Sequence, residues 1–266
     1  RLIYKKHLHQ EKVSFYYLTM NVLIVGDGSM GKEVEKILLA RDHHVVSRVD
    51  KKSEVGDTAG ITRDLLDKSD AVIEFSLAEA VFDNVNLYAE SKTPAVIGTT
   101  GWEDQREEIK TIVEEHKSAL LYGANFSIGA QLFMRIVKAA ALMVNHVPDY
   151  DVMMYELHHA NKKDSPSGTA RKIGEEILAA VDRKKRITTE RLDRKIEPEE
   201  LHIGSVRGGS INGIHNVLLD SPADTIELTH SARNRSGFAL GAVMAAEWLK
   251  NKTGFFTVDD FLEEIF

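Results

Sequence analysis

The sequence predicts an α/β protein: a Rossmann-type doubly wound parallel sheet joined to a smaller α+β domain. Short apolar runs alternate with helical patterns from Met20 to about Tyr122. A glycine-rich turn separates the first apolar run from the first helical pattern, and the alternation ends after about Ser127. Strands that alternate with helices over short connections form parallel sheets with right-handed crossovers. We therefore expect a doubly wound first domain and a second domain of different architecture.

The first domain is expected to contain five buried strands. Each corresponds to a short apolar run between turn residues, as is typical of a strand covered on both faces. These runs are Asn21–Val25, His44–Val49, Ala71–Phe75, Ala95–Ile97 and Ala119–Tyr122. Helices are expected at Met30–Leu39, at 79–91 and at 103–117.

The second domain is expected to mix helices and strands. A long helix is predicted at Gly129–Val147, an alternating strand at Tyr150–Leu157 and a helix at Thr169–Val181. The charged segment 183–200 is expected to be an exposed loop. Three strand-like pieces then precede a further helix: Leu201–Val206, Asn216–Leu219, Thr225–His230 and Ser236–Leu249. The pattern Thr257-x-x-Asp260 resembles a capping box that opens a final helix.

Composition excludes several classes of function. The chain has 266 residues and a formal net charge of -7, and its basic runs are short, so we expect no nucleic-acid partner. No apolar run approaches the roughly 18 residues that span a membrane, so we expect no membrane partner either. Cysteine is absent, which excludes disulfides, thiolate metal sites and a cysteine nucleophile. This composition fits a reducing compartment, and we expect the protein to be cytoplasmic.

Residues 1–19 are expected to be upstream sequence. Their basic start, followed by the largely apolar residues 13–18, resembles a signal peptide. That apolar stretch runs directly into the first predicted strand, however, without a small-residue cleavage site. We therefore expect Met20 to be the natural start.

A dinucleotide site is predicted at the first glycine-rich turn, Gly26-Asp27-Gly28-Ser29-Met30-Gly31. This G-x-G-x-x-G follows a predicted strand and opens a predicted helix, which is the required context; the alternative is an ordinary strand–helix turn. The glycines would allow a tight turn, a close approach of backbone to pyrophosphate, and close helix–strand packing. The helix N-terminus would bind the phosphates. Asp50 closes the second strand, where a carboxylate would bind the adenosine ribose.

The choice between NADH and NADPH depends on the residues next to Asp50. This carboxylate favours NADH through the ribose 2′-hydroxyl. Lys51 and Lys52 could bind the 2′-phosphate of NADPH, or could simply be solvated turn residues. We therefore expect the protein to use both NADPH and NADH.

The catalytic candidates lie between the alternating strand and the next helix. His158 and His159 end the strand, Lys162 follows in a polar loop, and Ser167-Gly168-Thr169 opens the helix. A histidine can donate a proton near neutral pH, a lysine adds a cation, and a helix start can bind an anion. The alternative is a pair of exposed loop histidines and a simple helix cap. The histidine pairs lack the i, i+4 spacing of zincins, so no metal is expected.

This stretch resembles a known family. His158-His159-x-x-Lys162-x-Asp164-x-Pro166-Ser167-Gly168-Thr169-Ala170 is similar to the signature of the dihydrodipicolinate (4-hydroxy-tetrahydrodipicolinate) reductases. Ser165 stands where the family often has alanine. Four other segments are similar to family motifs: Val96–Gly101, Ala124–Ser127, Arg207–His215 and Arg235–Phe238. The glycine loop departs from the family, because an arginine found in many members is missing.

The resemblance implies an NAD(P)H-dependent oxidoreductase of lysine and diaminopimelate biosynthesis. Its substrate would be a cyclic imine dicarboxylate, reduced by hydride transfer and protonation of the resulting enamine. Residues 20–126 and 233–266 would form the cofactor domain, and 127–232 the substrate and oligomerisation domain of a homotetramer.

The resemblance also implies roles for individual residues. His158 would be the general acid, and Lys162 a carboxylate anchor or alternative donor. His159, Ser167, Gly168 and Thr169 would bind substrate carboxylates. Further cofactor contacts would come from Gly98, Thr99, Thr100, Ala124, Asn125, Phe126, Ser127, Arg235 and Phe238.

Two other functions fit parts of the sequence. One is an amino-acid dehydrogenase of the aspartate or diaminopimelate type, which has a similar architecture. The other is a nicotinamide-sensing regulator without turnover. Aspartate-semialdehyde dehydrogenase is excluded because that chemistry needs a cysteine nucleophile.

Overall fold

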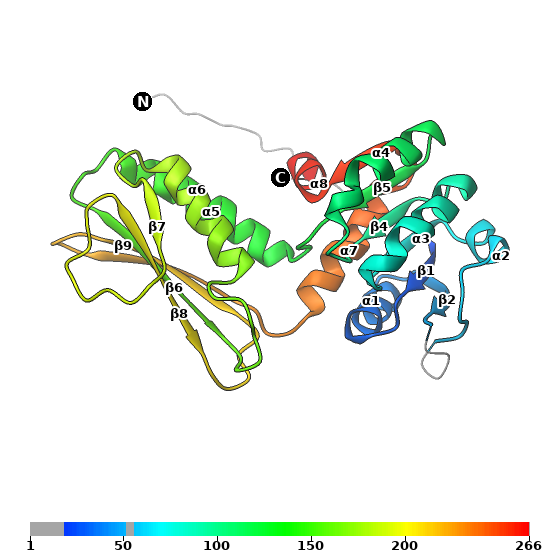
Figure 1. Cartoon of the computed structure of the whole chain (residues 1–266), viewed down its shortest axis with the longest axis horizontal. Helices are drawn as coiled ribbons and strands as arrows, with labels where there is room; N and C mark the ends of the chain where they lie inside the picture. The colour runs from blue at the N-terminus through cyan, green and yellow to red at the C-terminus, as the bar shows by residue number, and fades with distance from the viewer. Residues whose placement is uncertain (1–18, 52–55, 266) are drawn as a thin grey trace, which may run out of the picture.

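Two lobes, each built around one β-sheet, make up the protein (Figure 1). This computed structural model describes residues 19–51 and 56–265. The expectation that residues 1–19 are upstream sequence therefore lies outside the described residues, since Thr19 alone of this segment is described. Lys52 also lies outside them.

Sheet A contains six strands, all parallel, in the order β11-β5-β4-β3-β1-β2. Five of them match the sequence prediction: β1 (Asn21–Val25), β2 (His44–Val49), β3 (Ala71–Glu74), β4 (Ala95–Ile97) and β5 (Ala119–Tyr122). The sixth, β11 (Gly254–Thr257), was not predicted. The doubly wound fold class is thus confirmed.

Helices cover both faces of sheet A, as its apolar strands require. On one face, α1 (Ser29–Ala40), α7 (Ser236–Leu249) and α8 (Val258–Ile265) contribute to one apolar core. On the other, α2 (Arg63–Asp67), α3 (Ala78–Ser91) and α4 (Arg106–Glu115) contribute to a second core, with a 3-10 turn at Glu103–Gln105 before α4. The carboxyl ends of β1, β2 and β3 remain available for a ligand.

The C-terminal end of the chain returns to sheet A. After α7, β11 pairs with β5 in parallel. The capping box predicted at the next helix is confirmed, because Thr257 N donates to Asp260 Oδ2 at 2.7 Å and Asp260 N donates to Thr257 Oγ1 at 3.3 Å.

Sheet B is mixed and has the order β10-β9-β6-β8-β7. Its strands are β6 (Asp151–His158), β7 (Arg186–Thr188), β8 (Glu200–Arg207), β9 (Ile214–Asp220) and β10 (Thr225–Ser231). Two helices, α5 (Ile128–Asn145) and α6 (Gly168–Ala180), share an apolar core with one face of the sheet. The predicted α+β architecture is therefore present.

The prediction of an exposed loop at 183–200 is wrong in part. This segment contains β7, and it includes two charged residues, Lys184 and Glu200, that are each only 2% exposed. Lys184 Nζ lies 2.6 Å from Asp151 Oδ1 and donates to Glu200 O, while Glu200 pairs with Arg186 and Arg194. Charged residues are buried when they are paired, so charge content alone misplaced them.

Helix α5 is the one helix of the described residues that is long and apolar enough to cross a membrane. Only 39% of its apolar window is buried, yet the helix packs against α6, α7 and β10.

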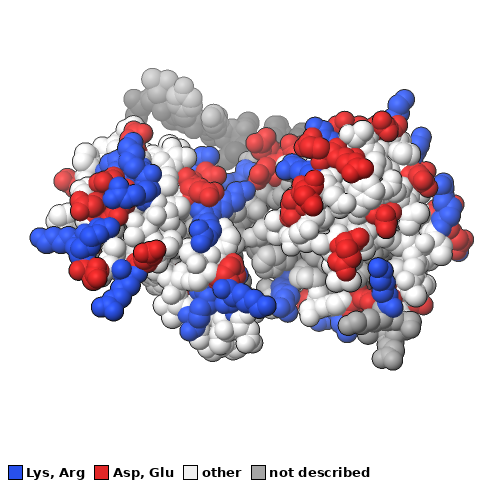
Figure 2. All heavy atoms as spheres, viewed as in Figure 1, with Lys and Arg blue, Asp and Glu red and all other residues white. Residues whose placement is uncertain are grey.

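Basic and acidic side chains are interspersed over both lobes on the face shown in Figure 2. No continuous basic stripe is visible among the described residues on this face.

Candidate active site

A first cavity, of about 650 Å³, lies at the carboxyl ends of β1, β2 and β3. Gly26, Asp27, Gly28, Ser29, Asp50 and Lys51 line it, as predicted for the dinucleotide, together with Lys32, Ala59–Ile61 and Phe75–Leu77, which the sequence did not indicate. The carboxyl edge of a parallel sheet, beside the first helix, is where such folds bind nucleotides.

The glycine loop has the geometry that a dinucleotide requires. Gly26 has φ +93°, and a Cβ there would lie 2.2 Å from Phe75 O. A Cβ on Gly31 would lie 2.1 Å from Gly26 O, so helix and loop pack too closely for a side chain. Gly28 has nothing within 4 Å of its Cβ position. The open space therefore lies over Gly28, where the backbone would meet a pyrophosphate.

The start of α1 also fits a phosphate group. Gly28 is the N-cap residue, and no described side chain caps the helix or adds an acid to its first turn. Its amide groups and positive dipole end are thus available to an anion. Asp50 Oδ2 accepts a hydrogen bond from Asp27 N at 3.0 Å, which holds the carboxylate beside the loop.

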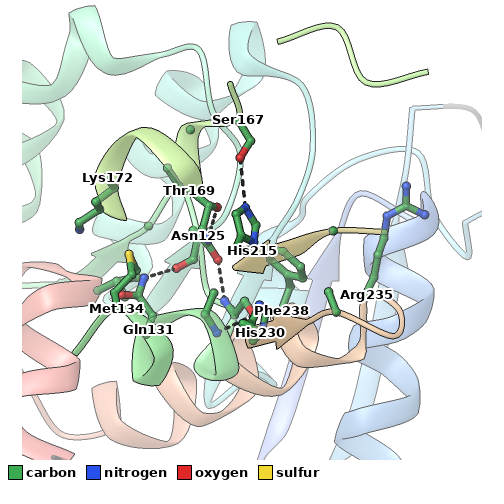
Figure 3. Close-up of a pocket in the computed structure, with 18 of the residues that line it drawn as sticks. Asn125, Gln131, Met134, Ser167, Thr169, Lys172, His215, His230, Arg235 and Phe238 are labelled. Atoms are coloured by element: carbon green, nitrogen blue, oxygen red, sulfur yellow. Dashed lines mark hydrogen bonds between the residues drawn. The ribbon is translucent and has the colours of Figure 1, made fainter. Parts of the chain in front are cut away.

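A second cavity, of about 710 Å³, is lined by residues from both lobes. It contains all the predicted substrate and catalytic residues: His158, His159, Lys162, Ser167, Gly168 and Thr169. It also contains five predicted cofactor contacts: Ala124, Asn125, Ser127, Arg235 and Phe238. The two sets meet directly, since Asn125 Nδ2 donates to Thr169 Oγ1 at 3.3 Å (Figure 3).

Six other predicted cofactor residues lie outside the linings of both cavities: Met30, Gly31, Gly98, Thr99, Thr100 and Phe126. Some of them support the first cavity from behind. A Cβ on Gly98 would lie 2.0 Å from the Phe75 ring, and Thr99 Oγ1 accepts from Ser76 N at 2.8 Å.

The predicted catalytic loop presents its groups from defined positions. His158 ends β6 and is 6% exposed. Lys162 Nζ lies 2.8 Å from Asp164 Oδ1, a pairing that a substrate carboxylate could replace. Ser167 caps α6, because its Oγ accepts from Ala170 N at 3.1 Å, and the same Oγ lies 3.2 Å from His215 Nε2 (Figure 3).

Glu156 is the buried centre of this site. It is fully buried, and its Oε1 accepts from Ser167 N at 2.9 Å, Ser205 Oγ at 3.0 Å and Arg207 NH2 at 2.6 Å. Burial opposes ionisation of the carboxyl, but these hydrogen bonds lower the pKa of Glu156 to about 2. A permanent anion therefore lies beside the histidines.

Three of the four histidines that line the cavity have lowered pKa values, which favours their neutral forms. Burial lowers the pKa of His158, although the charge of Glu156 opposes the shift. Burial and then the charge of His158 lower the pKa of His215 to about 4, and burial also lowers the pKa of His230. The rings of His158 and His215 lie 5.3 Å apart, and those of His215 and His230 lie 6.3 Å apart. Proton donation from His158 would thus require proton uptake first.

One trio in the cavity has the spacing of metal ligands. Glu156, His158 and His215 each offer one ligand atom, and these atoms lie within 4.8 Å of one another. Two cations oppose a metal ion there, because Arg207 donates to Glu156 at 2.6 Å and Lys162 acts electrostatically on both histidines. Chemistry without a metal therefore stays a prediction.

Sequence reasoning missed Glu156, His215 and His230 as site residues. The signal for Glu156 was available: alternate residues of a strand share a face, which places Glu156 and His158 with the buried Val152 and Met154. His215 was noted only within a resemblance motif. The position of His230 depends on the pairing of β9 with β10, which the sequence does not reveal.

The glycine loop has space for a phosphate group, and the second cavity is lined by histidines and a lysine together with residues of both lobes. These features define a two-domain oxidoreductase of the Rossmann class. The family description "Dihydrodipicolinate reductase, N-terminus" matches residues 20–126, and its C-terminal counterpart matches 129–262. The chain belongs to the dihydrodipicolinate reductase family, which confirms the resemblance seen in the sequence.

Individual relatives agree over nearly the whole chain. The 4-hydroxy-tetrahydrodipicolinate reductase of Christiangramia forsetii is 39% identical over 248 residues, covering 93% of this chain and 99% of the relative. That of Archaeoglobus fulgidus is 38% identical over 263 residues, covering 92% and 100%. Among solved structures, a dipicolinate-bound dihydrodipicolinate reductase from Paenisporosarcina sp. TG-14 has the same fold, with a TM-score of 0.70, 24% identity and coverage of 90% and 98%.

Proposed function

We propose that this protein reduces 4-hydroxy-tetrahydrodipicolinate to tetrahydrodipicolinate with NADH or NADPH, in lysine and diaminopimelate biosynthesis. The observation that carries the proposal is the second cavity, where predicted cofactor contacts and the His158–Thr169 segment line one space. The names of the relatives in Christiangramia forsetii and Archaeoglobus fulgidus support this substrate.

The cofactor domain consists of residues 20–126 and 233–266, and the substrate domain of 127–232. The first cavity takes the adenosine and pyrophosphate against Gly26–Gly31 and Asp50. The chain from Gly98 to Thr100, the segment Ala124–Ser127, Arg235 and Phe238 serve the nicotinamide end. Support comes from the contact of β11 with β5 and from the packing of α7 on α1, which tie the C-terminal segment to sheet A.

The second cavity takes the substrate. His159, Lys162 and the Ser167–Thr169 helix start hold its two carboxylates, because a cation and a helix N-terminus both favour anions. Loss of the 4-hydroxyl group as water gives the conjugated ring, and a nicotinamide held at this end of the cavity would supply the hydride that reduces it. His158 then delivers a proton to the resulting enamine, and Lys162 neutralises the adjacent carboxylate or donates in its place.

Both cofactors support turnover in this proposal. Asp50 binds the ribose hydroxyls of NADH, and the exposed Lys51 lines the same cavity, where it offsets the 2′-phosphate of NADPH.

The protein works as a cytoplasmic homotetramer assembled through sheet B. The face of this sheet opposite α5 and α6 carries exposed apolar side chains, among them Met153 and Tyr155 on β6 and Val206 on β8. Exposed apolar residues on adjacent strands favour contact between subunits.

A coupled assay tests the function. Pyruvate and aspartate semialdehyde are condensed by the upstream synthase, and the loss of NADH or NADPH absorbance is followed on adding this protein. Oxidation that requires both the condensed product and this protein is expected. Oxidation only with an amino-acid dehydrogenase substrate, or cofactor binding without any turnover, would replace the proposal with one of the two alternatives.

A further inference from the structure

Glu156 is a buried carboxylate to which the proposed reaction assigns no role. It lies on β6 two residues before His158, on the same face of the strand, and is fully buried behind His158, which lines the second cavity. A buried carboxylate is costly unless it is paired, so its position calls for an explanation.

The two oxygens of Glu156 have different surroundings. Oε1 accepts from Ser167 N, Ser205 Oγ and Arg207 NH2, which fixes the side chain in one orientation. Oε2 lies 3.3 Å from His158 Nδ1 and 3.6 Å from His215 Nε2. Among the described residues it has no hydrogen-bond partner, and neither does His158 Nδ1. Oε2 therefore faces two imidazole rings and can accept a hydrogen bond from a ring nitrogen that carries a proton.

An anion at Nδ1 sets the orientation and tautomer of His158. A carboxylate 3.3 Å from Nδ1 favours the tautomer that carries its hydrogen on that nitrogen, which would leave Nε2 for the substrate. Nε2 lies 3.0 Å from the position that a Cβ on Gly213 would occupy, and Gly213 lines the cavity. The missing side chain at Gly213 thus gives Nε2 access to the cavity.

The same carboxylate is connected to the predicted anion cradle. Ser167 donates its N–H to Glu156, and its Oγ both caps α6 and approaches His215. An anion bound at the start of α6 would therefore lie next to Ser167, and Ser167 donates a hydrogen bond to Glu156, the carboxylate beside His158.

We propose that Glu156 is a positioning residue, whose carboxylate orients His158 and stabilises its imidazolium, so that His158 takes up a proton when a dicarboxylate enters the cavity. The proton comes from solvent, is held on His158 and passes from Nε2 to the reduced substrate. This inference rests on the proposed function for that last step only.

Other charges around His158 set the balance. Lys162 in the loop and Arg207 on β8 oppose its protonation, while Asp164 in the loop favours it. His215 on β9 faces it at 5.3 Å, and His230 on β10 faces His215. Without a ligand, burial keeps the pKa of His158 low. A dicarboxylate bound in the cavity would add negative charge beside Lys162 and His158, which favours the imidazolium form of His158.

The test measures proton uptake on binding of dipicolinate, a pyridine dicarboxylate, to the intact protein with NADH bound. Calorimetry at pH 7 in buffers of different ionisation enthalpy gives the number of protons taken up, expected to approach about one per site in the wild type. Glu156→Gln keeps the size and the acceptor at Oε1 but removes the charge. Its uptake should fall to a small fraction of the wild-type value.

Kinetics give a second readout that a purely structural role would not change. In Glu156→Gln, kcat should fall about 10²-fold, at the low end of general acid–base contributions, while KM for NADH is preserved. The limb of the kcat profile that falls with rising pH should move to lower pH, because the imidazolium has lost its anion.

Glu200→Gln is the matched control. Glu200 is a buried carboxylate of the same sheet, paired with Arg186 and Arg194, and it lies at the opposite end of β8 from Arg207, the partner of Glu156. It should retain both proton uptake and the kcat profile. Equal uptake and an unshifted profile in a folded Glu156→Gln would overturn the inference, as would equal effects in the two variants. Uptake without any turnover of 4-hydroxy-tetrahydrodipicolinate by the wild type would instead refute the proposed function.

Discussion

Helix α7 passes closest to the β5–α5 connection at Gly241. A Cβ on this buried glycine would lie 1.8 Å from Phe126 O and 2.9 Å from Phe126 C. Both are backbone atoms, so no rotamer change relieves the overlap, and Gly241→Ala must displace either α7 or the 123–127 segment. Overpacking of this kind costs about 1–3 kcal/mol. Alanine recovers about 1 kcal/mol through helix propensity, which leaves a net loss of up to about 2 kcal/mol.

Gly237→Ala on the same helix is the control. A Cβ there meets only Ser127 Oγ, at 3.6 Å, which is an ordinary contact. In proteins of about this size 1 kcal/mol corresponds to roughly 2–4 °C, so Gly241→Ala should unfold several degrees below wild type. Gly237→Ala should unfold at or above the wild-type temperature. NADH binding, followed by fluorescence, should weaken in Gly241→Ala because Asn125 and Ser127 line the cavity beside the displaced segment. Identical melting curves for the two variants would refute this packing argument.

Five further predictions concern the site and the assembly. His158→Gln should lower kcat about 10²–10⁴-fold while sparing NADH affinity. It should also abolish the fall in kcat/KM that the wild type shows as pH rises through the lowered pKa of His158. Near-normal turnover of this variant over a range of pH would make Lys162 the leading acid. Lys162→Ala should lower kcat and raise the substrate KM, and its combination with His158→Gln should be milder than the product of the two losses, as steady-state kinetics would show. Asp50→Ala should reduce kcat/KM more with NADH than with NADPH, and equal reductions would show that Asp50 does not read the ribose. Dialysis against EDTA should leave turnover unchanged. Light scattering at micromolar concentration should give the mass of a tetramer rather than that of a monomer.

The strands of sheet A could be predicted because they are short, apolar and bounded by turn residues. The glycine loop could be predicted because two of its three glycines are needed for steric reasons that recur in such folds: Gly26 and Gly31 have no space for a side chain. Strand β11 was missed because its four residues, Gly254–Thr257, lie between two helices and are stabilised by pairing with β5, which is distant in sequence.

The second cavity could be predicted only in part. The His158–Thr169 segment is continuous in sequence, so its groups were found together. Glu156 was overlooked although its position in an alternating strand places it on the buried face. His215 and His230 reach the cavity through the pairing of β6 with β9 and of β9 with β10, and long-range pairing of this kind has no local signal.

Deuterium transfer tests the central claim most directly. NADH labelled with deuterium at nicotinamide C4, prepared in both stereochemical forms, is incubated with this protein and freshly condensed 4-hydroxy-tetrahydrodipicolinate. The account predicts that one of the two forms yields tetrahydrodipicolinate one mass unit heavier, and that His158→Gln slows the appearance of this product. Product without deuterium from both forms, or no product while NADH remains intact, would contradict it.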